Sequence, residues 1–112
     1  MLTFIDTNKL PRRKTPEGDV TEVLNHDLCG AKNVVAALHW LKSGEKLTAA
    51  ASDKHQLLYL MEGNGSIRLD KKDYDVSKGA GVYLGPSESA TIEPATGASL
   101  KVLRLMVSQI PV

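Results

Sequence analysis

The side chains of this chain best suited to acid–base chemistry or metal binding are its three histidines and its single cysteine. The histidines, His26, His39 and His55, are scattered along the chain without the spacing of a ligand motif, and Cys29 is the single cysteine. Metal sites bring imidazole, thiolate and carboxylate groups together in recognisable arrangements. With Glu62 as a further carboxylate, a metal site built from these scattered residues is an alternative to which the sequence gives little support.

Composition narrows the class of partner. The chain has 14 basic and 13 acidic side chains and a net charge of +1, so it lacks the dense positive charge that nucleic acid or anionic lipid requires. No apolar run approaches the roughly 18 residues of a membrane-spanning helix, and the first residues do not have the pattern of a signal peptide. A single cysteine cannot form an internal disulfide. We therefore expect a cytoplasmic protein that binds neither nucleic acid nor membrane.

Short apolar runs separated by turn signals must position these side chains. Leu57–Met61 leads directly into Glu-Gly-Asn-Gly, a strong hairpin signal. Three alanines, Ala49–Ala51, and the apolar spacing over residues 47–61 would also suit an amphipathic helix, but the strand-like pattern after it favours strands. Further strands are expected at residues 21–24, 34–41, 66–69, 74–76, 81–84, 90–93 and 100–107. The pattern predicts one all-β domain at residues 20–112, after an irregular N-terminal arm at residues 1–19.

Two glycine-bounded segments carry a resemblance to a known family. Gly44 and Gly63 bound the first, which ends in the apolar strand and Glu-Gly turn LLYLMEG. Gly79 opens the second, which continues with VYLGPS. In these motifs the chain resembles a single-domain cupin from Gly44 to Ile92. The resemblance implies a small single-domain β-barrel of the jelly-roll type, a pocket inside the barrel, and a homodimer.

The positions at which that family holds its metal ligands carry other residues. The family's motifs supply two histidines, a glutamate and a further histidine, and the resemblance places them on Ala50 and Ser52 (or Ala49 and Ala51), Gln56 and Ala90. Alanine has no donor atom, and a neutral amide is a poor replacement for a carboxylate. We therefore expect neither a metal ion nor another cofactor.

Alternation along a strand decides which side chains line the pocket. His39 and Trp40 are adjacent, so one of them should face the interior; an inward His39 would be a buried acid or base, and an inward Trp40 a stacking surface. We favour Trp40 in the core and His39 on the outer face. Gln56 should face inward, where it either orients a ligand or bonds to the backbone. Ser52 is a further polar candidate. Tyr83 would join the set if it lined the mouth of the barrel. For both Tyr59 and Tyr83, however, we favour a position on the outside of the barrel.

These features predict a metal-free protein that binds a small organic ligand in the barrel, as a sensor or carrier, through His39, Trp40, Ser52, Gln56 and Tyr83. One alternative is a metal-independent isomerase, epimerase, dehydratase or cyclase, in which His39 or His55 acts with Tyr59 or Tyr83. Another is an interaction module whose barrel is filled by its own side chains. The fold alone does not choose among the three.

Overall fold

Ten strands and no helix make up the part of the chain that the computed structural model describes, which is residues 10–15, 18–24 and 34–107. The strands are β1 (Arg13–Thr15), β2 (Gly18–Leu24), β3 (Val34–Leu41), β4 (Leu47–Ala49), β5 (His55–Glu62), β6 (Asn64–Leu69), β7 (Lys72–Ser77), β8 (Gly81–Leu84), β9 (Ala90–Pro94) and β10 (Leu100–Val107). Since these residues contain no helix, none of them forms a helix that could cross a membrane.

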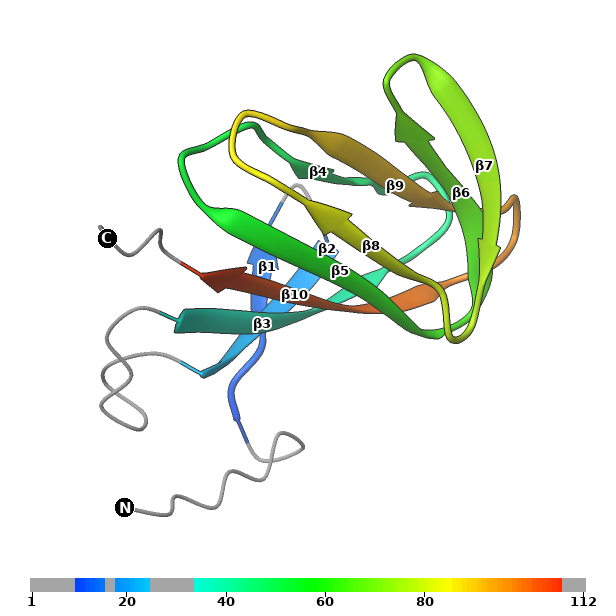
Figure 1. Cartoon of the computed structure of the whole chain (residues 1–112). Helices are drawn as coiled ribbons and strands as arrows, with labels where there is room; N and C mark the ends of the chain where they lie inside the picture. Colours follow the sequence, from blue (N-terminus) through cyan, green and yellow to red (C-terminus); the bar gives the residue numbers. More distant parts are fainter. Residues whose placement is uncertain (1–9, 16–17, 25–33, 108–112) are drawn as a thin grey trace.

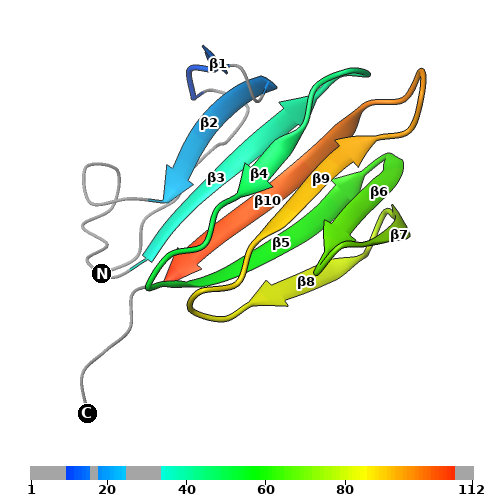
Figure 2. The ribbon, with the colours of Figure 1, turned by 90° about the horizontal axis from the view of Figure 1, so that it is seen from above.

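The strands form two antiparallel sheets that face each other as layers (Figure 1). The larger sheet has six strands in the order β1-β2-β3-β10-β5-β8, and the smaller has four in the order β4-β9-β6-β7. The chain crosses repeatedly between the layers, and Figure 2 shows the smaller sheet lying over the β10 and β5 side of the larger one. This arrangement confirms the predicted all-β fold of jelly-roll type.

The helix considered for residues 47–61 does not form. The segment instead supplies β4 and β5, with residues 50–54 between them. β4 pairs with β9, whereas β5 lies between β10 and β8 in the other sheet. These long-range pairings outweigh the local helix preference of Ala49–Ala51, which is only a weak prior.

The inward side chains of the two sheets form one apolar core. Along β5, Leu58 and Leu60 are buried, whereas Leu57 and Tyr59 between them are exposed, as expected for strands that alternate between two faces. The buried core consists of Leu41, Leu58, Leu60, Leu84, Leu100 and Val102 from the larger sheet and Leu47, Ala49, Ile67, Ala90 and Ile92 from the smaller one. The core therefore fills the space between the β3–β10–β5–β8 side of the larger sheet and the smaller sheet.

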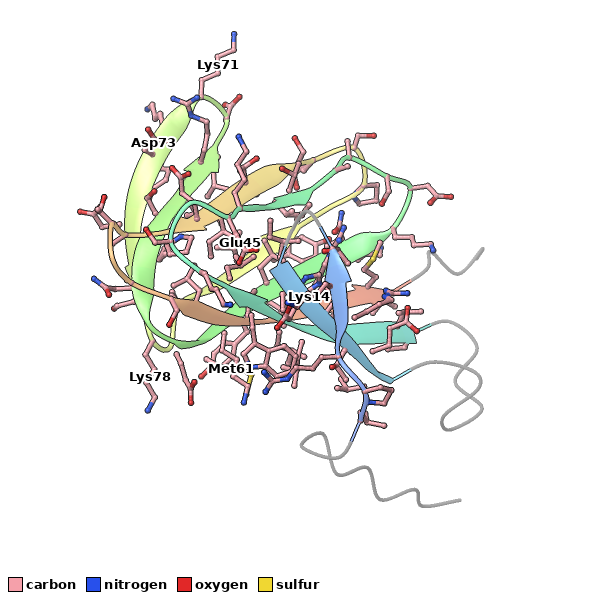
Figure 3. The ribbon with its side chains drawn as sticks, turned by 180° about the vertical axis from the view of Figure 1, so that it is seen from behind. Lys14, Glu45, Met61, Lys71, Asp73 and Lys78 are labelled. Atoms are coloured by element: carbon pink, nitrogen blue, oxygen red, sulfur yellow. The ribbon has the colours of Figure 1, made fainter. Side chains whose placement is uncertain are left out.

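The edge of the smaller sheet that is formed by β7 is polar and exposed. Every residue of β7 except Val76 is exposed, and the Arg68 Nε donates to Asp73 Oδ1 across the β6–β7 hairpin at 3.0 Å. Figure 3 shows Lys71 and Asp73 at the tip of this hairpin, away from the body of the domain. Charged side chains on an edge strand discourage pairing with another chain.

The segment before β1 lies on the outer face of the larger sheet. The Thr21 hydroxyl donates to the carbonyl oxygen of Pro11 at 3.0 Å, and the Arg12 guanidinium lies 3.8 Å from the centre of the Trp40 ring. Residues 13–15 then pair with residues 18–20 as the first two strands of that sheet. The hydrogen bond and the cation–π contact thus fix this segment to β2 and β3.

Gly63 joins β5 to β6 at a point of close backbone contact. Its φ of +94° lies in the region that favours glycine, and a Cβ at this position would overlap the carbonyl oxygen of Ser99. Gly79 has a similar φ of +98°, but a Cβ there would meet nothing within 4 Å. Substituting each glycine in turn therefore distinguishes the free-energy cost of the positive φ, which both positions share, from the cost of the overlap, which only Gly63 has.

We predict that Gly63→Ala destabilises the domain more than Gly79→Ala does. The positive φ alone should cost about 1–2 kcal/mol at each position, and the overlap with Ser99 should add about 1–3 kcal/mol at Gly63 only. Urea unfolding followed by circular dichroism measures both free energies. Equal losses in the two variants would show that the backbone at Ser99 moves aside.

Candidate functional site

The inner face of the larger sheet has an apolar end and a polar end. Residues opposite each other in antiparallel strands share a face, and Leu41 opposite Leu100 lies in the core. The same face continues along β3 and β10 through the pairs His39–Val102, Ala37–Arg104 and Val35–Met106. The burial of Leu41 thus places His39 and Arg104 on the inner side of the sheet.

A cavity of about 250 Å³ lies at the polar end of this face. The side chains of β3 and β10 that line it are Val35, Ala37, His39, Arg104 and Met106, and those of the first two strands are Arg13, Thr15, Val20 and Glu22. In the row that crosses the cavity, Ala37 lies between Glu22 and Arg104. The small side chain of Ala37 lines the cavity in this row, with an acidic residue on one neighbouring strand and a basic residue on the other.

Gln56 holds the guanidinium of Arg104 in place. The amide oxygen of this glutamine accepts hydrogen bonds from Arg104 Nε at 3.2 Å and Nη2 at 2.9 Å. Its amide nitrogen donates to the carbonyl oxygen of Ala50 at 3.0 Å. Because Gln56 is only 1% exposed, both ends of its amide group are bonded in a site shielded from water, which fixes the amide orientation.

The structure places two of the five predicted ligand-binding residues, His39 and Gln56, on the inner face. His39 is 5% exposed and lines the cavity. Trp40 lies on the outer face, between Arg12 at 3.8 Å and Lys101 at 5.9 Å. The favoured orientation, with Trp40 in the core and His39 outside, is therefore wrong. The physical reason is that Leu41 occupies the core, so Trp40 next to it must face outward.

Ser52 and Tyr83 lie away from the cavity. The Ser52 hydroxyl accepts a hydrogen bond from the backbone nitrogen of Lys54 at 3.1 Å, in the turn before β5. Tyr83 is 62% exposed on the outer face of β8, and the exposed Tyr59 shares that face, as we expected from the sequence. The structure therefore does not bring these residues together with His39 and Gln56.

One of the histidine–tyrosine pairs considered for acid–base chemistry does form, but outside the barrel. The Nδ1 atom of His55 lies 2.7 Å from the hydroxyl oxygen of Tyr83, and the two rings stack with centroids 6.0 Å apart. Both side chains lie on the outer face of the larger sheet, opposite to the inward Gln56. The pair is exposed to water and separated by the sheet from the cavity.

The residues considered as metal ligands are not assembled in the described part of the chain. His39 faces inward, His55 faces outward, and Glu62 is exposed at the end of β5, whereas His26 and Cys29 lie outside the described residues. Within residues 10–15, 18–24 and 34–107, no three His, Cys, Asp or Glu side chains are close enough to hold a metal ion.

Arg104 is the site residue that the sequence interpretation missed. A signal for it exists in the last strand, LKVLRLMV, where Arg104 stands in phase with the inward-facing Leu100 and Val102. A charged residue at an inward position of an apolar strand requires a polar partner. Here Gln56, the residue at the position of the cupin glutamate, is one such partner.

With the fold and the cavity established, the comparisons with known proteins identify the class. Residues 34–111 match the family model of the AraC-like ligand-binding domain. Since this match covers most of the chain, the protein belongs to that family, and with it to the cupin superfamily that its motifs resemble. No curated protein matches the sequence.

Solved structures with the same fold have distant sequences. The chain is similar to a predicted oxalate decarboxylase from Thermotoga maritima (15% identity, TM-score 0.84, 96% of this chain and 100% of that one). It is also similar to the polyketide cyclase RemF from Streptomyces resistomycificus (13% identity, TM-score 0.82, 100% and 83% of the two chains). A Cupin 2 conserved barrel domain protein from Salinispora arenicola is a third (13% identity, TM-score 0.75, 96% and 88%). At these identities the likeness shows the fold and not the activity.

We predict that Gln56→Met destabilises the domain by about 1–3 kcal/mol, because the Ala50 carbonyl and the Arg104 guanidinium each lose a buried hydrogen-bond partner. Tyr83→Phe is the matched control, since it removes an exposed hydrogen bond and should change stability by less than about 0.5 kcal/mol. Urea unfolding gives both values. A loss in Gln56→Met no larger than that in the control would contradict a buried network at this site.

Proposed function

We propose that this domain binds a small organic ligand in the cavity on the inner face of the larger sheet, and that it does so without a metal ion. The observation that carries the proposal is the convergence of His39 and Arg104 on a cavity whose other walls include Val20, Val35 and Met106. Apolar walls with a few fixed polar groups are typical of small-molecule sites. Membership of a ligand-binding family supports the same conclusion.

A metal ion does not fit the residues at the cupin ligand positions. Ala49 and Ala90 are opposite each other in the β4–β9 pair, and both belong to the apolar core. The amide oxygen of Gln56 already accepts two hydrogen bonds from the positively charged guanidinium of Arg104. A metal cation at that oxygen would be repelled by the guanidinium.

The cavity also bears on the two alternatives. The apolar core fills the space between the two sheets, so the alternative of a filled barrel stays open for that part of the domain. The cavity of about 250 Å³ lies beside it, on β1, β2, β3 and β10, and is smaller than the roughly 300–1,000 Å³ of sites for drug-sized ligands. A metabolite of modest size would fit it. For the enzyme alternative, Tyr59 and Tyr83 lie on the opposite face of the sheet from His39, so the expected acid–base pair is not assembled in the cavity.

The ligand hypothesis predicts that Ala37→Leu removes binding without unfolding the domain, because the larger side chain extends into the cavity that Ala37 lines. Ala51→Leu, in an exposed turn, is the matched control. Small molecules released from each purified protein are identified by mass spectrometry, and elemental analysis reports bound metal. The wild type and the control should release the same compound, and Ala37→Leu little or none.

Either of two results would contradict this proposal. Equal amounts of the compound in Ala37→Leu and the control would place binding elsewhere, and a stoichiometric transition metal would refute the metal-free mode. The cytoplasmic location and the homodimer expected from the sequence stay predictions; light scattering after size-exclusion chromatography would test the homodimer.

A further inference from the structure

Strand β8 ends the larger sheet, and within the described residues it pairs with β5 alone. Figure 2 shows it at the margin of that sheet. Edge strands usually carry charges or proline, which discourage pairing with another chain. The β7 edge of the smaller sheet follows this rule, with Lys72, Asp73 and Asp75. The sequence of β8, GVYL, contains neither a charge nor a proline, so its outer edge lacks this protection.

The backbone groups at this edge belong to Gly81 and Tyr83. Leu60 of β5 exchanges two backbone hydrogen bonds of 2.8 Å with the turn before β8. Alternate residues of a strand direct their backbone groups to the same side, so Leu58 also faces β8, where Val82 lies opposite it. Gly81 and Tyr83, on either side of Val82, therefore direct their N–H and C=O groups away from β5.

A cavity of about 460 Å³ lies beside β8. Among the side chains that line it are the apolar Leu69, Val82 and Leu84 and the acidic Asp70 and Glu88. Its walls come from β8, from the end of β6 and from the turn between β8 and β9. An extended segment added beside β8 would thus direct alternate side chains towards an apolar surface.

The charged side chains of this cavity are both acidic. Asp70 and Glu88 line it, and none of its described lining residues is basic. Lys71, next to Asp70, points away from the domain (Figure 3). Glu88 Oε1 accepts a hydrogen bond from the backbone nitrogen of Gly85 at 2.6 Å, which holds its carboxylate in place. Charge complementarity therefore favours a basic partner.

A second copy of this chain would fit the edge less well. If two β8 strands paired about a two-fold axis, each would lie beside the carboxylates of the other copy. Strand β8 has no basic side chain to meet Asp70 and Glu88. Such a pair would therefore gather four carboxylates without a compensating cation from β8.

We propose that the outer edge of β8 docks an extended, basic segment of another protein, which adds a strand to the larger sheet. Its backbone pairs with Gly81 and Tyr83, and its lysine or arginine side chains lie near Asp70 and Glu88. In such strand addition, main-chain hydrogen bonds give affinity and alternate side chains give specificity. The residues that line this site differ from those of the cavity beside β1, β2, β3 and β10, so the inference does not depend on the proposed ligand.

Two capped heptapeptides test the charge requirement. One is acetyl-Lys-Thr-Val-Thr-Val-Thr-Lys-amide, and the other has glutamate in place of both lysines. Each is titrated into the ¹⁵N-labelled full chain at constant ionic strength, and amide shifts are followed by NMR. The basic peptide should shift the amides of Gly81 and Tyr83. It should bind at least about tenfold more tightly than the acidic one, since each exposed ion pair contributes up to about fivefold.

N-methylated forms of the basic peptide test the strand pairing. In an added strand, alternate N–H groups face β8 and the others face away. Methylation of the threonine nitrogens in one peptide and of the valine nitrogens in another should therefore abolish binding in one case and leave it unchanged in the other. Equal binding of the two methylated peptides would overturn the added strand.

A double variant assigns the charge preference to the two carboxylates. Asparagine tolerates the φ of 50° at Asp70, and glutamine keeps the acceptor oxygen of Glu88, so Asp70→Asn with Glu88→Gln should fold. It should lower the preference for the basic peptide by about tenfold. Asp75→Asn with Glu93→Gln is the matched control, since it removes two exposed carboxylates that share a row of the smaller sheet. An equal loss in both double variants would overturn the assignment.

Two further results would contradict the proposal. A dimer in light scattering, with the Gly81 and Tyr83 amides protected from hydrogen exchange before any peptide is added, would assign the edge to a second copy. Absence of shifts at β8 with the basic peptide would show that the edge accepts no such strand. Neither result bears on ligand binding beside β3.

Discussion

The pairing of β10 with β3 on one side and β5 on the other is the constraint on which the rest of the structure depends. It aligns four inward residues of β3 with four of β10, and three of β5 with three of β10, in rows across the inner face of the larger sheet. Leu41, Leu100 and Leu60 are driven into the core at one end, since burying such a side chain contributes about 1.5–3 kcal/mol. Because side chains alternate between the two faces of a strand, His39 and Arg104 must then lie on the same inner face. The apolar end of the sheet thus determines what the polar end presents.

Hydrogen bonds to Gln56 meet part of the cost of an inward arginine. Arg104 donates to Gln56, and Gln56 donates to the carbonyl of Ala50, so the network ends on the backbone next to β4. Ala37, the neighbour of Arg104 on β3, lines the same cavity as this arginine. An apolar residue at position 104 would simplify this packing, because buried ionic groups rarely stabilise a fold better than hydrophobic ones. The retention of a charge and a cavity side by side therefore favours a role in binding over a role in stability.

Much of the fold could be predicted from the sequence, because turn chemistry and apolar alternation are local signals. The strands Val34–Leu41, Gly81–Leu84 and Leu100–Val107 have the expected bounds. The segment from Leu47 to Met61 was ambiguous for a physical reason: its alanines favour a helix locally, and only pairing with β9, β10 and β8 decides for strands. The strand at residues 21–24 was expected, but β1 and the first residues of β2 were harder to foresee, because proline, glycine and charged residues dominate residues 11–19.

The site was less predictable, because one strand taken alone has two equivalent faces. His39–Trp40 could not be oriented from tryptophan's size, and the deciding facts were the burial of Leu41 and the contact of Arg12 with the Trp40 ring. Gln56 was found because its position in the motif implied an inward side chain. Arg104 was missed because charge normally marks an outward position.

Gln56 and Arg104 together explain how the motif can persist while its chemistry changes. A jelly roll fixes where inward side chains converge, but not which atoms they carry. At this point of convergence the chain has alanine or serine at the three histidine positions and an amide at the glutamate position. Strand β10 brings a guanidinium to that amide. The positive charge is then covalently part of the protein and always present, since arginine stays protonated.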